Sequence, residues 1–231
     1  MTPEITKQQG RTDSLLTTWM ASVCLLGNGC FTVIVLALHL LQPELSPYNE
    51  AVSYYVHGAH GWLLTVGLLS WGFGSVALLL GLARTARTRV GNAGLWGLAV
   101  WSVGVILGGL FRADPPGQWN KPPSMAGLIH GNAALVAFIA LPIAAFLLSR
   151  GLRRAPEWRA VTGILYALAI ITAVSLISFF TSLLPVFISP GPPMLLGLTE
   201  RILLTAYVAW LCVVAIGLLR SSANRFSMDR M

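Results

Sequence analysis

The stretch FRADPPGQWNKPPSMAGLIHG, Phe111 to Gly131, carries the pattern that decides the fold. It leaves one long apolar run, crosses a short loop with four prolines and enters the next apolar run. Arg112, Asp114, Lys121 and His130 lie within it, although only 10% of the 231 residues are charged. A polar, Pro-rich segment between two apolar runs is typical of a loop that joins two membrane-spanning helices. We therefore expect this stretch to form the lid of a pocket at one face of a membrane bundle.

The rest of the chain repeats this alternation of apolar runs and short polar turns. Hydrophobic residues make up 55% of the sequence, and the mean hydropathy is +0.73. Several apolar runs reach the length of roughly 20 residues that a helix needs to cross a bilayer. No polar stretch is long enough for a second domain, so we predict one all-α integral membrane bundle. It comprises polar tails over residues 1–13 and 221–231, a membrane domain over 14–220, and six transmembrane helices at Leu15–Leu41, Gly61–Leu82, Val90–Phe111, Met125–Leu148, Val161–Val186 and Leu195–Leu219.

The first apolar run is expected to be a retained helix and not a cleaved signal peptide. It exceeds the apolar core of a signal peptide, which is about 7–15 residues, and no small-residue cleavage site follows it. Gly27, Asn28 and Gly29 lie at its centre. Glycines let a second helix approach closely, and the Asn28 amide can hydrogen-bond across such a contact.

Basic residues are distributed very unequally between the two faces of the predicted bundle. Twelve of the fifteen Lys and Arg residues fall on the face that holds both termini. This asymmetry predicts cytoplasmic termini in a cell membrane, and the Arg-rich, Lys-poor composition favours a bacterial inner membrane. The short basic clusters form no continuous basic face, so a nucleic-acid partner is not expected. The twelve are Lys7, Arg11, Arg84, Arg87, Arg89, Arg150, Arg153, Arg154, Arg159, Arg220, Arg225 and Arg230, against Arg112, Lys121 and Arg201 on the other face.

The face opposite the termini collects the unusual polar residues. A charge near hydrocarbon is costly unless it is paired or faces a wet cavity, so these residues are expected to converge. One interpretation is structural: an Arg112–Glu200 or Arg201–Asp114 ion pair would tie the third helix to the sixth. Trp62, at the start of the second helix, fits an interfacial aromatic belt. The whole set comprises His39, His57, His60, Arg112, Asp114, His130, Glu200 and Arg201.

A second interpretation is a metal site with catalytic function. His57, Asp114 and His130 come from three helix ends and offer ligand types that suit zinc or iron. Glu200 could act as the base or the fourth ligand, and bound water could hydrolyse a lipid amide or ester. The sequence lacks HExxH and other close histidine pairs except His57 with His60. Haem is less favoured, because His57 with His130 is the one plausible axial pair.

A third interpretation is a binding pocket without chemistry, and we place it first. Polar helix ends, Gly-rich helices and a Pro-rich lid suit an outward-facing pocket for a lipid or small ligand. Arg112, Arg201 and Trp62 are the candidate ligand contacts. Transport is less favoured, because no inverted repeat and no acid deep within a span is visible. A structural subunit that packs against a membrane-protein partner stays open, with membrane lipids as the surrounding partners.

Four short motifs give the chain a family resemblance. They are His57-Gly58-xx-Gly61-Trp62, Phe111-Arg112-Ala113-Asp114-Pro115, Gly127-xx-His130-Gly131 and Gly197-xx-Glu200-Arg201. In their order and spacing, over about Leu15 to Leu219, the chain resembles the bacterial and archaeal membrane family labelled domain of unknown function 998. The resemblance implies a six-helix integral membrane protein and implies no established activity. It falls on the same polar residues that the physical argument selects.

Overall fold

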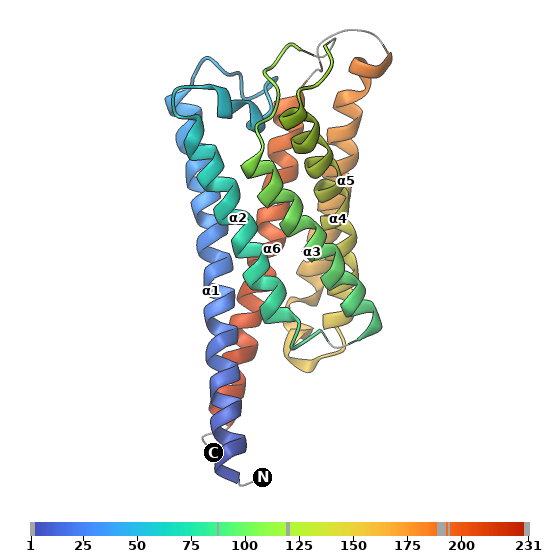
Figure 1. Cartoon of the computed structure of the whole chain (residues 1–231). Helices are drawn as coiled ribbons and strands as arrows, with labels where there is room; N and C mark the ends of the chain where they lie inside the picture. The colour runs from blue at the N-terminus through green and yellow to red at the C-terminus, as the bar shows by residue number, and fades with distance from the viewer. Residues whose placement is uncertain (1–2, 87, 119–120, 189–192, 194, 229–231) are drawn as a thin grey trace.

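The computed structural model describes residues 3–86, 88–118, 121–188, 193 and 195–228, and it shows a bundle of six long helices (Figure 1). No strand occurs among the described residues, and all six helices are long and apolar enough to cross a membrane. The all-α six-helix prediction is therefore confirmed. The helices are α1 Pro3–Leu41, α2 Gly61–Leu82, α3 Arg89–Leu110, α4 Met125–Leu152, α5 Arg159–Ile188 and α6 Leu196–Met228, with short 3-10 helices η1 Val52–His57 and η2 Pro156–Trp158.

The two outer ends of the bundle differ from the sequence prediction. α1 begins at Pro3 instead of Leu15, and α6 continues to Met228 instead of ending at Leu219. Much of each predicted polar tail is thus a helical extension of a membrane span. Neither extension contains a proline after its first helical position, so nothing in the backbone stops the helix where the apolar run ends. The predictions for Arg87, Arg230 and the loop around Pro190 lie outside the described residues.

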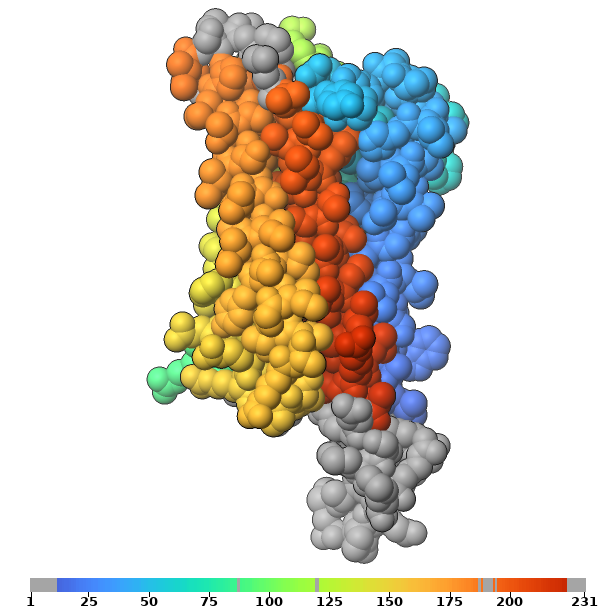
Figure 2. All heavy atoms as spheres, turned by 180° about the vertical axis from the view of Figure 1, so that it is seen from behind, coloured from blue at the N-terminus to red at the C-terminus, as the bar shows by residue number. Residues whose placement is uncertain are grey.

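The helices form a ring in which each packs against its neighbours in sequence, and α6 closes the ring against α1. On the face turned away from the viewer of Figure 1, α6 lies between α5 and α1 (Figure 2). Both termini lie at one end of the bundle, which we call the terminus end. At the other end, segments 42–60, 111–118 and 121–124 cover the helices, and we call it the lid end.

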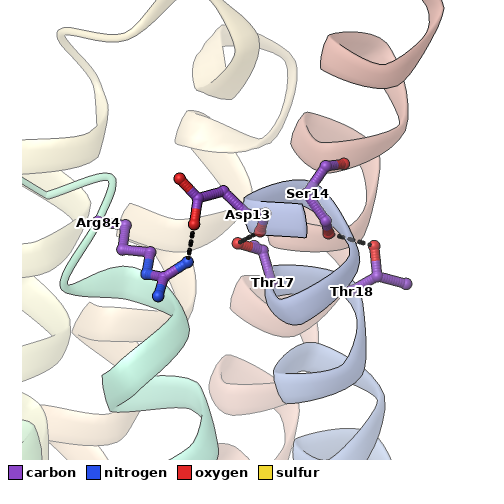
Figure 3. A network of polar contacts seen from close by, with 5 residues as sticks. All are labelled: Asp13, Ser14, Thr17, Thr18 and Arg84. Carbon is purple, nitrogen blue, oxygen red and sulfur yellow. Dashed lines mark hydrogen bonds and ion pairs between the residues drawn. The ribbon is translucent and has the colours of Figure 1, made fainter. Parts of the chain in front are cut away.

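Polar contacts between α1 and its neighbours hold the terminus end together (Figure 3). The Arg84 guanidinium, at the end of α2, pairs with the Asp13 carboxylate of α1 at 2.6 Å. Both side chains are largely exposed, so this ion pair contributes at most about 1 kcal/mol. The Ser14 hydroxyl donates to the Ser222 carbonyl oxygen of α6 at 3.0 Å. These contacts place the helical extensions of α1 and α6 side by side.

The predicted close contact at the centre of α1 is present and involves α2. A Cβ added at Gly27 would overlap the backbone carbonyl oxygen of Ser70, so the two helices touch through their backbones. The Asn28 side chain is fully buried, and its Oδ1 accepts a hydrogen bond from Trp71 Nε1 at 2.9 Å. The expectation that Asn28 bonds across a glycine-mediated contact is confirmed. Gly29 points elsewhere, and a Cβ added there would meet nothing within 4 Å.

Candidate functional site

A cavity of about 510 Å³ occupies the lid half of the bundle. All six helices and both lid segments contribute to its lining. Most of the lining is apolar, and the polar groups gather toward the lid. The volume lies within the range of roughly 300–1,000 Å³ that is common for ligand sites.

A layer of aromatic rings, one from each helix, lies below the cavity and forms what we call the aromatic floor. Neighbouring rings along this layer have centroids 4.1 to 6.2 Å apart, with one stacked pair and otherwise edge-to-face contacts. On each of α1 to α5, the cavity-lining residue farthest from the lid belongs to this layer. The floor consists of Phe31, Trp71, Trp101, Phe138, Phe179 and Tyr207, in the order of the helices α1 to α6.

The polar atoms of the aromatic floor are satisfied within the protein. Trp71 Nε1 donates to Asn28, and Trp101 Nε1 donates to Ser75 Oγ at 3.1 Å. The Tyr207 hydroxyl donates to the carbonyl oxygen of Phe138 at 2.6 Å. With its donors occupied, the floor presents ring faces and edges to the cavity, which suits the apolar part of a ligand.

Glu200 provides a buried carboxylate in the cavity wall. Its side chain is 6% exposed and lies in the first turns of α6. Oε2 accepts a hydrogen bond from the backbone N–H of Val52 in η1 at 2.6 Å. Among the described residues, no cation pairs with this carboxylate and no donor reaches Oε1. The neighbouring Arg201 guanidinium does not line the cavity and forms no ion pair with this carboxylate.

Asp114 provides a second carboxylate, held where the lid turns into α4. Ser124 caps this helix, because its Oγ accepts from the backbone N–H of Gly127 at 3.0 Å. The backbone N–H of Ser124 in turn donates to Asp114 Oδ2 at 3.0 Å. A Cβ added at Gly127 would overlap the Asp114 carboxylate, so glycine is needed for this close approach. The motifs around Asp114 and Gly127 therefore form one local unit.

His130 joins α4 to the end of α3. Its Nδ1 lies 3.0 Å from the Gly108 carbonyl oxygen and 2.9 Å from that of Phe111. Because carbonyl oxygens only accept, Nδ1 carries the proton, and a neutral ring then has an acceptor lone pair on Nε2. His130 also lines the cavity. The imidazole thus caps the end of α3 through Nδ1 and belongs to a residue of the cavity wall.

The predicted metal ligands His57, Asp114 and His130 all lie at the lid end, but their side chains do not form a cluster. His57 Nε2 lies 2.8 Å from the carbonyl oxygen of Ala113, and the His57 side chain is otherwise exposed. His130 and Asp114 are engaged with backbone groups as described above. Within the described residues, no three His, Cys, Asp or Glu side chains come together as a metal site requires. The zinc or iron prediction gains no support from this arrangement.

Arg201 is the centre of a separate network on the other side of α6. Nε donates to His39 Nε2 at 2.8 Å, and Nη2 donates to the Tyr55 hydroxyl at 3.1 Å. Nη1 donates to the carbonyl oxygens of Glu50 and Gly197 at 2.8 and 2.9 Å. His39 Nδ1 in turn lies 2.6 Å from the Val35 carbonyl oxygen. Arg201 therefore anchors segment 42–60 to α6 and α1 and does not line the cavity.

The predicted Arg112–Glu200 and Arg201–Asp114 ion pairs are wrong. The ion pair found among the described residues is Arg84–Asp13, at the opposite end of the bundle. Arg112 is exposed and does not line the cavity. Backbone groups largely take the place of the expected partners: an amide N–H for each acid, and two carbonyl oxygens, beside His39 and Tyr55, for Arg201. A sequence does not reveal such partners, because every residue carries them.

Two aromatic residues at the lid end, Trp62 and Tyr54, differ in whether they line the cavity. Trp62 is 63% exposed and does not line the cavity, as expected for a residue of an interfacial belt. Tyr54, which sequence reasoning did not select, does line it. Burial raises the pKa of the Tyr54 phenol, and the negative charges of Glu200 and Glu50 raise it further. The hydroxyl is therefore protonated at neutral pH.

The six spans, the closed ring and the cavity at the lid end define a multi-pass helical membrane protein. Its motif residues gather around one end of the bundle, in the lid and the helix ends below it. The chain belongs to the family described as "Protein of unknown function (DUF998)", whose model matches residues 25–217. This confirms the resemblance noted from the four motifs, and the family description assigns no activity. Searches of curated proteins and of solved structures found no match.

Proposed function

We propose that this protein binds an amphipathic molecule in the cavity at the lid end. The apolar part of the ligand would lie against the aromatic floor, and its polar head would lie among Asp114, His130 and Glu200. The observation that carries this proposal is the order of the lining along the bundle axis. Rings with satisfied donors lie deepest, and groups with spare hydrogen-bonding capacity lie under the lid. Such a gradient from apolar to polar complements a lipid or a similar small amphiphile.

We further propose that the lid end faces away from the cytoplasm, in a cell membrane that we infer to be a bacterial inner membrane. The support is the distribution of basic residues in the sequence, in which twelve of fifteen Lys and Arg fall in the tails and loops assigned to the side of the termini. In this orientation the ligand would enter from the outer leaflet or the space beyond it. Metal-dependent hydrolysis is less well supported, because the three candidate ligands are engaged with backbone groups.

The experiment is a binding assay with an amphiphile that quenches tryptophan fluorescence. The probe is a twelve-carbon alcohol that carries bromine at the end of its chain. If its chain enters the cavity, the bromine approaches Trp71 and Trp101 of the floor, and their fluorescence falls. The titration is carried out on the purified protein in a non-ionic detergent.

The matched variants are Gly131→Leu and Gly29→Leu. Gly131 lines the cavity, and a Cβ added there meets nothing within 4 Å, so a larger side chain can occupy the cavity without a clash with the backbone. Gly29 has the same open surroundings but does not line the cavity. We expect Gly131→Leu to weaken probe binding about tenfold, because lost apolar contact of this size is worth about 1.5 kcal/mol. Equal binding by wild type and Gly131→Leu would refute the proposed function.

A further inference from the structure

We propose that the cavity selects an amphiphile whose head group is a protonated amine, held by the carboxylate of Glu200. The inference rests on the proposed function and adds the chemical class of the ligand. It follows from the charges, the hydrogen-bonding roles and the orientation of the groups around the head-group end of the cavity.

The charge at this end of the cavity is predominantly negative. Glu200 and Asp114 both line the cavity, whereas Arg112 and Arg201 do not. Lys121 is the one cation of the described residues in the lining, and it is exposed in the lid. A carboxylate as buried as Glu200 is costly unless a positive group accompanies it. A bound cation would provide that partner where the protein does not.

Three of the hydrogen-bonding positions in the lining that lack a donor are acceptors on acidic or imidazole side chains. Among the described residues, no donor reaches Oε1 of Glu200 or Oδ1 of Asp114. His130 has its donor on Nδ1, held by two carbonyl oxygens, so Nε2 of the neutral ring accepts. An ammonium group has three N–H donors and no acceptor, which matches this set. A carboxylate or phosphate head would instead face the like charge of Glu200 and Asp114, with the exposed Lys121 as the one cation of the described lining.

Arg201 forms no ion pair with Glu200, because its guanidinium is held by other partners. Its Nε, Nη1 and Nη2 donate to four acceptors on the side of α6 that faces away from the cavity. Gly197 lies one turn earlier, and a Cβ there would press against the Glu50 carbonyl oxygen and the Arg201 guanidinium. The tight packing keeps the guanidinium in place. The carboxylate of Glu200 is therefore available to a ligand.

The test compares dodecylamine, dodecanol and dodecanoate as competitors of the brominated alcohol. Dodecylamine is protonated at neutral pH, as a lysine side chain is. We expect the amine to bind at least about tenfold more tightly than the alcohol, as a charge-assisted hydrogen bond implies, and dodecanoate to bind most weakly. Each probe partitions into the detergent equally for every variant, so ratios between variants report the protein site.

Glu200→Gln should remove the advantage of the amine over the alcohol. The glutamine is isosteric, and its amide oxygen can still accept from Val52 N–H, so the fold is expected to persist. The control is Glu44→Gln, an exposed acid of lid segment 42–60 that does not line the cavity. It should retain the full preference. If Glu200→Gln does not fold, Asp114→Asn provides the second variant, with a smaller loss of the same preference.

The outcomes separate the two proposals. Equal binding of amine and alcohol by the wild type, or an unchanged preference in a folded Glu200→Gln, overturns the amine inference. If the brominated alcohol in that case still binds the wild type more tightly than Gly131→Leu, the proposed function stands. If the brominated alcohol binds wild type and Gly131→Leu equally, the proposed function fails, and the amine inference fails with it.

Discussion

The Tyr207 hydroxyl of α6 donates a 2.6 Å hydrogen bond to the backbone carbonyl oxygen of Phe138 in α4. In a regular α-helix that carbonyl accepts from the N–H four residues later. Residue 142 is a proline, which has no N–H, so the Phe138 carbonyl has no helical donor. The tyrosine from the facing helix replaces it. One contact thus allows a proline inside a membrane helix and fixes α4 against α6 at the aromatic floor.

We predict that Tyr207→Phe destabilises the protein by about 1 kcal/mol, a typical value for a hydrogen bond between membrane helices. The Phe138 carbonyl would then be buried without a donor. The measurement is the free energy of unfolding in detergent. The substitution keeps the ring and so keeps the contacts of the floor.

Pro142→Ala provides the control through a double-mutant cycle. Alanine restores the helical N–H to the Phe138 carbonyl, so Tyr207→Phe should cost much less in that background. Additive effects of the two substitutions would show that the proline and the tyrosine are independent and would contradict this account.

The two glycines that flank Asn28 are predicted to differ in their tolerance of a methyl group. Gly27→Ala would push a Cβ into the Ser70 carbonyl oxygen and lie 3.2 Å from the Gly74 Cα, so we expect a loss of about 1–3 kcal/mol. Gly29→Ala meets no atom within 4 Å, and alanine favours the helix by up to about 1 kcal/mol. Thermal unfolding of both variants measures the contrast. Similar melting temperatures for the two would argue against the close approach of α1 and α2.

Arg201→Lys should destabilise the lid by about 2 kcal/mol, because a lysine cannot reproduce the forked donors of the guanidinium. The same substitution should change the state of His39. In the wild type, Arg201 can only donate to Nε2 and the Val35 carbonyl can only accept from Nδ1, so the ring is the neutral Nδ1–H tautomer. Nitrogen chemical shifts of labelled histidine should show this tautomer, and a mixture in Arg201→Lys. Arg112→Lys, at an exposed arginine, should leave the His39 signals unchanged.

The proposed orientation predicts which loops a membrane-impermeant thiol reagent reaches in intact cells. The three native cysteines are first replaced, and single cysteines are introduced at Lys121 in the lid and Glu157 in η2. Both positions are exposed and lie at opposite ends of the bundle. We expect labelling of Lys121→Cys in intact cells, and of Glu157→Cys after the membrane is permeabilised. The reverse pattern would invert the topology.

The candidate site was partly visible in the sequence. His57, Asp114, His130, Glu200 and Arg201 all lie at the lid end, as their positions at helix ends predict. Their individual roles were not visible, because their partners are mostly backbone groups and residues far away in the chain. The aromatic floor was missed altogether, although Phe138 followed by Pro142 marks an open carbonyl that a buried hydroxyl could satisfy.

The number and order of the spans were determined by the sequence alone, because the bilayer requires about 20 consecutive apolar residues and local composition shows where they occur. The same holds for the asymmetry of basic residues and for the Pro-rich lid. Which way each helix turns about its own axis was decided only by the tertiary structure. Glu200 and Arg201 are adjacent in sequence, yet the first faces the cavity and the second faces His39. In a membrane the outer face of a helix is as apolar as the inner one, so periodicity does not mark the buried face. Helix rotation comes instead from packing between distant segments, and that packing separates the carboxylate from its neighbouring cation and creates the site.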